Sequence, residues 1–245
     1  MIAKTNIFYS STIDSTNQAL KAILDLIKPA NDVAFIAKYQ EKGKGQGTNE
    51  WESEKEMNLT FSLLKTNLAL QASEVFLLNK LVAVAIVELL KQLKVENVKI
   101  KWPNDILVNG RKICGILINN ILFGSNLQNS IIGIGLNVNQ KNFNTYERQA
   151  TSILLETGKK HEIWSVFENL LNILQLNFQL LVNNPSQFDR LYLENLYCLD
   201  EWRGYIIKGK RTNGKIIGVN NFGQLQMKIS SEEIISLNMK EVKFL

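Results

Sequence analysis

Lys101, Asn104, Asp105 and Lys112 bring two ammonium groups, an amide and a carboxylate into one short stretch of the chain. Carboxylate and amide oxygens are ligands for Mg²⁺, and ammonium groups bind phosphate and carboxylate anions. On strands that fold back on each other, these side chains suit a negatively charged substrate that carries a metal ion. The alternative is an ordinary surface hairpin with solvated charges, and the spacing alone favours neither interpretation.

The residues around these four side chains predict the strands that would hold them. Pro103 restricts the residue before it to an extended conformation, so a strand should end near residue 101, with a break over residues 103–105. A second short strand follows. Asn109-Gly110 between apolar residues is the strongest short-range signal for a hairpin turn, and a long apolar strand then begins at Lys112.

A second polar group precedes a predicted helix. Asp14, Ser15 and Thr16 are all good N-caps, and apolar residues at positions 20, 23, 24 and 27 recur at helical spacing until Pro29 ends the helix. The hydroxyls serve either to cap the helix only, or also to face a ligand, since a helix N-terminus offers N–H groups without intrahelical partners. A short strand is predicted before them, at residues 7–9.

Three glycines, at positions 43, 45 and 47, alternate with polar residues after an apolar strand predicted over residues 33–39. Such a flexible backbone can wrap phosphates, but a mobile surface loop fits the composition at least as well. The dinucleotide-binding fingerprint is excluded because Thr48 stands where its third glycine is needed. Trp51, at the exit of this loop, is expected to anchor it against the core.

Two long helices and two further strands complete the large part of the predicted fold. The helix over residues 73–93 is apolar on nearly all sides, which predicts burial, whereas the helix over 163–181 has a single apolar stripe. Strands are predicted over residues 58–64 and 131–139. Gly133 and Gly135 weaken the second of these strands, so we expect another backbone or a ligand to approach them closely.

The composition changes after Leu193, where short strand-like segments replace the helical patterns. Turns are predicted at Asn213-Gly214, at 220–223 and at 230–231, which is the spacing of a small β-barrel of about 50 residues. Segment 209–215 has the glycine and lysine spacing of a phosphate-binding loop. We reject that function because Ile216 stands where a metal-binding Ser or Thr is needed. The strands are expected over residues 205–208, 215–219, 225–229 and 233–237.

The whole chain has the composition of a soluble globular protein. Its 245 residues, 45% apolar and 21% charged, suffice for one large domain or for a large and a small one. We find no apolar run long enough to span a membrane and no secretory signal. Two cysteines are too few for a disulfide framework, so Cys114 and Cys198 are expected to be reduced core residues in the cytoplasm.

Charge and histidine content restrict the classes of function. The net charge of +5 favours anionic partners. The Lys and Arg residues are nevertheless scattered, and no predicted helix has a basic face interleaved with aromatic residues, so we do not expect DNA or RNA binding. His161 is the single histidine and precedes a predicted helix, where a solvated side chain is expected. A Ser-His-Asp triad or a multi-histidine metal site would depend on it.

Six segments, in this order, resemble the biotin protein ligases. The resemblance spans about residues 7–160, and Lys-Trp-Pro-Asn-Asp is its most specific motif. The segments are Asp14-Ser-Thr-Asn17, then Gln40 with Gly43-Lys-Gly-Gln46 and Trp51, Asn58-Leu-Thr-Phe-Ser-Leu63, Lys101-Trp-Pro-Asn-Asp-Ile106, Arg111-Lys-Ile-Cys-Gly-Ile116 and Gly133-Ile-Gly-Leu-Asn137.

The resemblance implies an α+β fold of the class II aminoacyl-tRNA synthetase and biotin ligase type. A mixed β-sheet backed by helices would form the catalytic domain over residues 1–195, and a small C-terminal SH3-like β-barrel would follow over 196–245. The implied reaction is ATP-dependent biotinylation. Biotin attacks the α-phosphate of Mg·ATP to give biotinyl-5′-adenylate, and a lysine of the biotin carboxyl carrier domain of a carboxylase attacks this intermediate. Some members dimerise through the sheet, which leaves a homodimer open.

The resemblance also implies roles for single residues. Lys112 is the implied catalytic residue, contacting the biotin carboxylate and the phosphate, and Asp105 is the implied ligand of Mg²⁺. The implied biotin-binding residues are Ser15, Thr16, Asn17, Gln40, Lys44, Gly45, Gln46, Lys112 and Gly115. The implied ATP-binding residues are Lys44, Trp51, Lys101, Asn104 and Asn137.

The sequence departs from the family pattern in the glycine-rich loop, which commonly reads Gly-Arg-Gly-Arg-Arg-Gly. Here Lys44 and Gln46 stand at arginine positions, which leaves open whether Gln46 helps to retain the adenylate. The chain starts almost at the catalytic core, without room for the N-terminal winged helix-turn-helix of bifunctional members, so we expect no repressor activity. Two alternatives remain: a lipoate–protein ligase of related fold, and a non-catalytic biotin-binding regulator, which would be expected to have lost Lys112.

Overall fold

A seven-stranded mixed sheet forms the centre of the protein in a computed structural model, which describes residues 5–144, 149–229 and 233–245. The strand order is β1-β2-β3-β7-β6-β5-β4. β1 and β2 pair in parallel, and each of the other neighbouring pairs is antiparallel. The strands are β1 (Asn6–Ser10), β2 (Val33–Ala37), β3 (Asn58–Gln71), β4 (Val98–Lys101), β5 (Asp105–Val108), β6 (Arg111–Phe123) and β7 (Asn126–Asn137).

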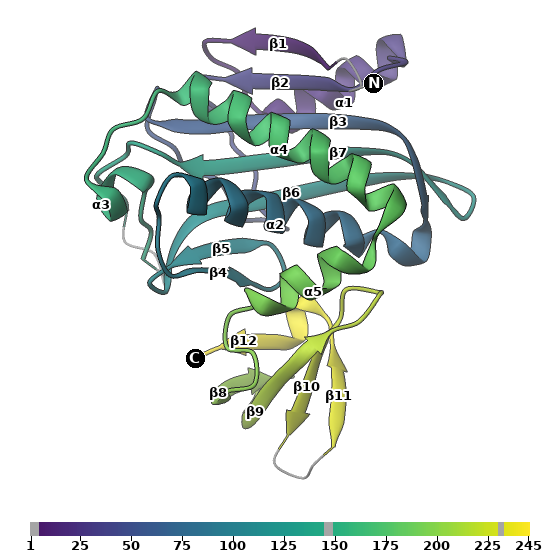
Figure 1. The fold of residues 1–245 in the computed structure, drawn as a ribbon, viewed down its shortest axis with the longest axis vertical. Helices are drawn as coiled ribbons and strands as arrows, with labels where there is room; N and C mark the ends of the chain where they lie inside the picture. Colours follow the sequence, from purple (N-terminus) through teal and green to yellow (C-terminus); the bar gives the residue numbers. More distant parts are fainter. Residues whose placement is uncertain (1–4, 145–148, 230–232) are drawn as a thin grey trace.

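Helices cover both faces of this sheet. α2 (Phe76–Gln92) and α4 (Ile163–Asn183) cross its front face in Figure 1, where they pack on alternate residues of β3 and β7 such as Phe61 and Ile134. α1 (Thr16–Ile27) packs on the residues of opposite parity, Leu64 and Ile131, and so lies on the other face. α2 is buried nearly all round, as its apolar sequence predicts.

The small domain is a five-stranded antiparallel sheet below the large one, consistent with the predicted SH3-like barrel (Figure 1). Its strand order is β11-β10-β9-β8-β12. The predicted boundary between residues 195 and 196 falls between α5 and β8. The elements are α5 (Ser186–Glu194), β8 (Trp202–Ile207), β9 (Lys210–Val219), β10 (Leu225–Ile229), β11 (Ile234–Leu237), the 3₁₀ turn η2 (Met239–Glu241) and β12 (Val242–Phe244).

The predicted turn at Asn213-Gly214 is wrong. Both residues lie inside β9, paired with Gly204 and Arg203 of β8. The turn between these strands is instead at Lys208 and Gly209, which both have positive φ. Packing requires a glycine at position 214, because a Cβ there would lie only 2.5 Å from Met227 Sδ on the neighbouring strand.

Other boundaries differ from prediction where tertiary packing extends or shortens an element. β3 continues past its predicted end at residue 64, and β7 begins before residue 131 and ends at 137 rather than 139, because the two strands pair along this length. The helix predicted to begin at residue 73 begins at 76, after the 3₁₀ turn η1 (Ala72–Glu74). The short helix α3 (Ile153–Thr157), α5 and β12 were not predicted. The predicted turn at residues 230–231 lies outside the described residues.

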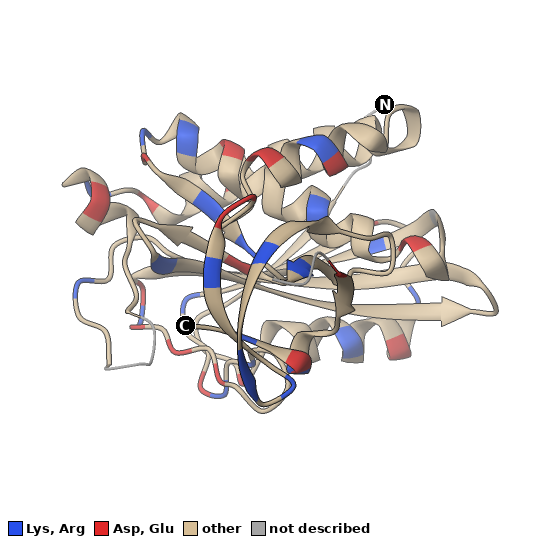
Figure 2. Cartoon of the chain, turned by 90° about the horizontal axis from the view of Figure 1, so that it is seen from below, with Lys and Arg blue, Asp and Glu red and all other residues tan. Residues whose placement is uncertain are grey.

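Charged side chains are scattered over the ribbon, and Figure 2 shows Lys and Arg interspersed with Asp and Glu. This agrees with the even distribution in the sequence. None of the helices in the described part of the chain is both long and apolar enough to cross a membrane.

Candidate active site

A pocket of about 240 Å³ opens beside the N-terminus of α1, over the middle of the large sheet. Its walls come from the start of α1, the glycine-rich segment 40–51, the turn between β4 and β5, and strands β6 and β7. Of the predicted site residues, all but Asn137 line it. They are Ser15, Thr16, Asn17, Gln40, Lys44, Gly45, Gln46, Trp51, Lys101, Asn104, Asp105, Lys112 and Gly115.

One end of the pocket is polar and uncharged. Gln40 accepts hydrogen bonds from the Thr16 backbone N–H at 2.8 Å and from the Thr16 hydroxyl at 3.1 Å. It therefore caps α1 from another segment, and the Ser15 side chain makes no cap hydrogen bond to the residues that the structure describes. Asn17 donates to the Leu117 carbonyl at 3.3 Å. This end presents hydroxyl, amide and backbone groups that can bind a neutral polar ligand.

Ser62 lies behind this polar end and was not predicted as a site residue. Its hydroxyl lies 2.7 Å from Thr16 Oγ1 and within hydrogen-bond distance of Asn17 Oδ1, and it is fully buried. The alternation of β3, with apolar residues at 59, 61 and 63 and polar residues at 58, 60 and 62, is the signal that could have found it.

Glycines form the floor of the pocket on β6 and β7. A Cβ on Gly133 would overlap Asn17 Oδ1, and a Cβ on Gly135 would overlap the Trp51 indole. Gly115 pairs with Gly135 across the two strands. A Cβ on Gly115 would lie 3.2 Å from Trp51 Cζ3. A close approach at Gly133 and Gly135 was predicted, but from another backbone or a ligand, whereas the structure places the side chains of Asn17 and Trp51 there.

The glycine-rich segment folds back on itself beside the pocket. The Gly45 N–H donates to the Asn49 carbonyl at 2.8 Å, and the Trp51 N–H donates to the Gly43 carbonyl at 2.9 Å. Gln46 Nε2 lies 2.6 Å from Met239 Sδ of η2 in the small domain. Trp51 thus connects this segment to the sheet, as predicted, because its indole lies against Gly115 and Gly135.

The other end of the pocket holds two lysines around one carboxylate. Lys112 Nζ lies 2.7 Å from Asp105 Oδ1, and Lys101 Nζ lies 3.8 Å from Asp105 Oδ2. The Asp105 and Lys101 side chains are largely buried, and that of Lys112 is one-third exposed. With one positive charge in excess among these three residues, this end favours an anionic ligand.

Asn104 holds the predicted hairpin together. Its amide donates to the Ile116 carbonyl at 2.8 Å, and the Ile116 N–H donates to the Asn104 carbonyl at 2.9 Å. The turn at Asn109-Gly110 is also as predicted, with positive φ at both residues. The hairpin therefore fixes Lys101, Asp105 and Lys112 on neighbouring strands.

Asn137 is the predicted site residue that does not line the pocket. It is buried two positions after Gly135, and its amide donates to the Thr151 carbonyl at 3.0 Å. Among the described residues, its Oδ1 atom and the Trp51 Nε1 atom are both buried without a hydrogen-bond partner. Five other buried side-chain atoms there share this state, on Ser53, His161, Asn177, Tyr192 and Tyr205.

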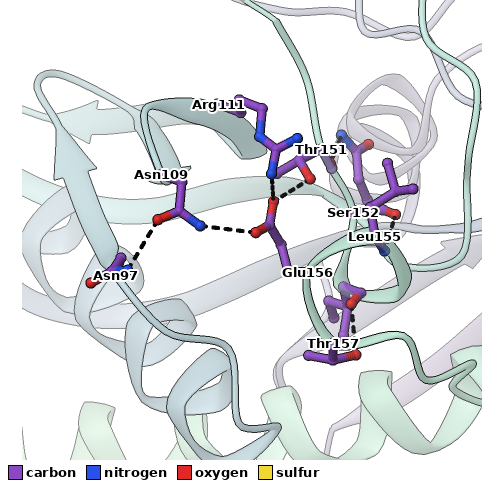
Figure 3. Close-up of polar contacts among 10 residues, drawn as sticks. Asn97, Asn109, Arg111, Thr151, Ser152, Leu155, Glu156 and Thr157 are labelled. Atoms are coloured by element: carbon purple, nitrogen blue, oxygen red, sulfur yellow. Dashed lines mark hydrogen bonds and ion pairs between the residues drawn. The ribbon is translucent and has the colours of Figure 1, made fainter.

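A buried carboxylate, Glu156, supports the strand that carries Lys112 (Figure 3). It accepts hydrogen bonds from Arg111 at 2.8 Å, from Asn109 at 3.1 Å and from the Thr151 hydroxyl. The Lys112 carbonyl in turn accepts from the Thr151 N–H at 2.9 Å. Glu156 was not predicted, because its partners are up to 47 residues away in the sequence.

Replacing Glu156 by alanine is expected to lower the free energy of unfolding by about 2 kcal/mol, because three donors would lose one shared, largely buried acceptor. The measurement is urea denaturation. Glu194→Ala is the matched control: Glu194 pairs with Arg190 on the surface, so its removal should change stability by no more than about 0.5 kcal/mol. Equal losses in the two variants would contradict this role for Glu156.

Two other features lie apart from this pocket. A larger cavity of about 430 Å³ lies between β3 and α4, lined by apolar side chains and by polar ones that include the paired Lys65 and Asp32, and none of the predicted site residues contributes to it. Cys114 and Cys198 are buried thiols, as predicted. Burial raises the pKa of the Cys114 thiol far above its ordinary value, so this sulfur is not a nucleophile.

Comparisons with known proteins agree with the geometry. The model of the biotin/lipoate A/B protein ligase family matches residues 9–137. The bifunctional ligase/repressor BirA of Bacillus spizizenii is 31% identical over 228 residues, which are 90% of this chain and 68% of that protein. The biotin–protein ligase of Homo sapiens is 30% identical over 141 residues, covering 56% of this chain and 19% of the human protein.

Solved structures share the fold over nearly the whole chain. Biotin protein ligase from Aquifex aeolicus in complex with biotin and ATP has a TM-score of 0.78 at 23% identity, and the match covers 98% of both chains. Biotin protein ligase from Leishmania major in complex with biotinyl-5-AMP has a TM-score of 0.63 at 22% identity, and the match covers 95% of this chain and 98% of the other.

Proposed function

This chain belongs to the biotin/lipoate A/B protein ligase family and is a biotin ligase, and we propose that it activates biotin as biotinyl-5′-adenylate and transfers the biotinyl group to a lysine of a carrier domain. The observation that carries the proposal is the pocket with two unlike ends. A neutral polar end at α1 faces the cationic end at Lys112, with the glycine floor between them.

The two ends suit the two ends of biotin. The ureido group is neutral and needs both donors and acceptors, which Ser15, Thr16, Asn17 and Gln40 can supply. The apolar chain of the vitamin would pass Gly115, beside the Trp51 indole that packs against the glycine floor. Its carboxylate would then lie at Lys112.

Adenylate formation joins two anions, so their repulsion must be offset where they meet. A carboxylate oxygen of biotin forms a bond to the α-phosphorus of ATP, and the bond from that phosphorus to the bridging oxygen of pyrophosphate breaks. Lys112 would stabilise the charge on the attacking carboxylate and on the α-phosphate. Lys101 and Asn104, at the same end, would hold the polyphosphate in line for attack.

Asp105 is a chemically suitable ligand for the Mg²⁺ that accompanies ATP, because its carboxylate lines the pocket between the two lysines. One carboxylate suffices when phosphate oxygens supply further ligands. The bound ion would neutralise phosphate charge at this end of the pocket.

The nucleoside is expected beside Trp51 and Asn137. Both residues carry a buried polar atom that has no hydrogen-bond partner within the described part of the chain, a donor on Trp51 and an acceptor on Asn137. Adenine has acceptor and donor groups that can pair with them. Binding of ATP would thus explain two atoms whose burial is otherwise unfavourable.

In the second step the carrier lysine, as a neutral amine, attacks the carbonyl carbon of the mixed anhydride. The bond between that carbon and the phosphate oxygen breaks, AMP leaves, and the amine loses a proton as the amide forms. The glycine-rich segment, with Lys44, Gly45 and Gln46 in the pocket wall, would shield the anhydride from water before this attack.

Release of pyrophosphate tests the first step. With ATP and biotin the protein should release pyrophosphate and accumulate one adenylate per active site, whereas lipoate should give only the background rate. The lysine of a co-expressed carrier domain should then gain the mass of one biotinyl group. Release with lipoate but not with biotin would favour the lipoate ligase, and release with neither would leave a non-catalytic binding protein.

A further inference from the structure

The small domain contributes an aromatic ring to the cationic end of the pocket. Lys101 Nζ lies over the ring of Phe244 on β12, 4.9 Å from its centroid. On the opposite side of Asp105, Lys112 Nζ lies 5.7 Å from the centroid of Trp51. Each of the two lysines that flank Asp105 is therefore placed over an aromatic face from a different segment.

The Phe244 ring is held firmly within the small domain. It contacts Tyr205 edge-on at 5.4 Å between ring centroids, and β12 pairs with β8 so that these two residues face each other. Tyr197 lies 6.4 Å away on another side. Tyr205 is fully buried, so the ring has little freedom to follow the lysine if the lysine moves.

The two domains are also joined around Lys101. The Ile100 carbonyl accepts from the Tyr197 N–H at 2.8 Å, and the Trp102 indole donates to the Gly223 carbonyl at 2.9 Å. The residues on both sides of Lys101 are therefore bound to the small domain or to its connection. Phe244 and this part of β4 hence keep a fixed relative position.

We propose that Phe244 is a positioning residue for Lys101, and that through it the small domain forms part of the site that binds the ATP polyphosphate. This rests on the proposed function. The face of Phe244 attracts the Lys101 ammonium group, which lies 3.8 Å from Asp105 Oδ2. Because a lysine side chain has many rotamers, contact with this ring favours those that keep the ammonium group at the pocket, where the proposed phosphate would bind.

The test compares Phe244→Leu, which keeps apolar volume but removes the ring, with Phe244→Tyr, which keeps it. Phe244→Leu should raise KM for ATP about tenfold, with kcat and the affinity for biotin changed less than about twofold, and Phe244→Tyr should behave as wild type. Trp202→Leu on β8, an exposed residue of the same domain, is the matched control and should leave KM unchanged. A leucine variant with normal KM, or a tyrosine variant as impaired as the leucine variant, would overturn the proposal.

A double-mutant cycle separates positioning from a general effect of the small domain. Lys101→Met should raise KM for ATP at least as much as Phe244→Leu, and adding Phe244→Leu to it should cause almost no further change. Full additivity would mean that Phe244 acts without Lys101. The affinity for α,β-methylene-ATP, which cannot release pyrophosphate, should follow the same pattern. This binding arm tests the role of Phe244 even if the wild-type protein fails to biotinylate a carrier.

Discussion

Replacing Lys112 by alanine should lower the rate of pyrophosphate release by about three orders of magnitude while leaving the protein folded. Lys112 Nζ is 2.7 Å from Asp105 and lies over Trp51, where the two substrate anions are proposed to meet. Without its charge, Lys101 and the proposed Mg²⁺ are left to offset their repulsion at this end of the pocket. The side chain is one-third exposed, so its loss leaves no core cavity. The measurements are pyrophosphate release at saturating biotin and ATP, and urea denaturation.

Lys99→Ala provides the matched control, because Lys99 is an exposed lysine on β4 and lies outside the pocket lining. Its removal should leave both the rate and the stability near those of wild type. Lys112→Arg should recover only part of the activity, since the guanidinium keeps the charge but has a different shape and reach. Wild-type turnover by Lys112→Ala would exclude this residue from the mechanism.

The site could be predicted from sequence mainly where local chemistry determines the backbone. Pro103 and the Asn109-Gly110 pair specify the hairpin that carries Lys101, Asp105 and Lys112, and the structure has this hairpin at the predicted residues. The alternate glycines of β7 likewise indicated a close approach. Each of these signals lies within a few residues of the feature that it predicts.

Other features depend on contacts between distant segments, which no local pattern records. Phe244 meets a lysine 143 positions earlier, and Glu156 meets Arg111 across 45 positions. Asn213-Gly214 shows the opposite error, because a strong local turn signal is overridden by packing. There the Met227 side chain of the neighbouring strand leaves no space for a Cβ at position 214, and the chain turns at Lys208 and Gly209 instead.

Gly135→Ala is expected to lower the affinity for biotin about a hundredfold and the free energy of unfolding by about 1–3 kcal/mol. The new methyl group would overlap the Trp51 indole. Gly135 is paired with Gly115 on β6 and Thr60 on β3, so the strand cannot move away from the ring. The indole must therefore shift into the pocket, where it would narrow the proposed path of the biotin chain. Calorimetric titration with biotin and urea denaturation measure the two effects.

Gly218→Ala on β9 is the control for the general cost of replacing a glycine within a strand. Its new methyl group would not be crowded, because the nearest atom would be 3.8 Å away. It should preserve biotin binding. The variant Trp51→Ala with Gly135→Ala tests the cause directly: if the indole is the obstacle, adding the methyl group to a protein that lacks the ring should cost little further stability. The same loss with and without the ring would show instead that Gly135 is required by its neighbouring strands. The Trp51 indole would then not be the reason for the glycine at position 135.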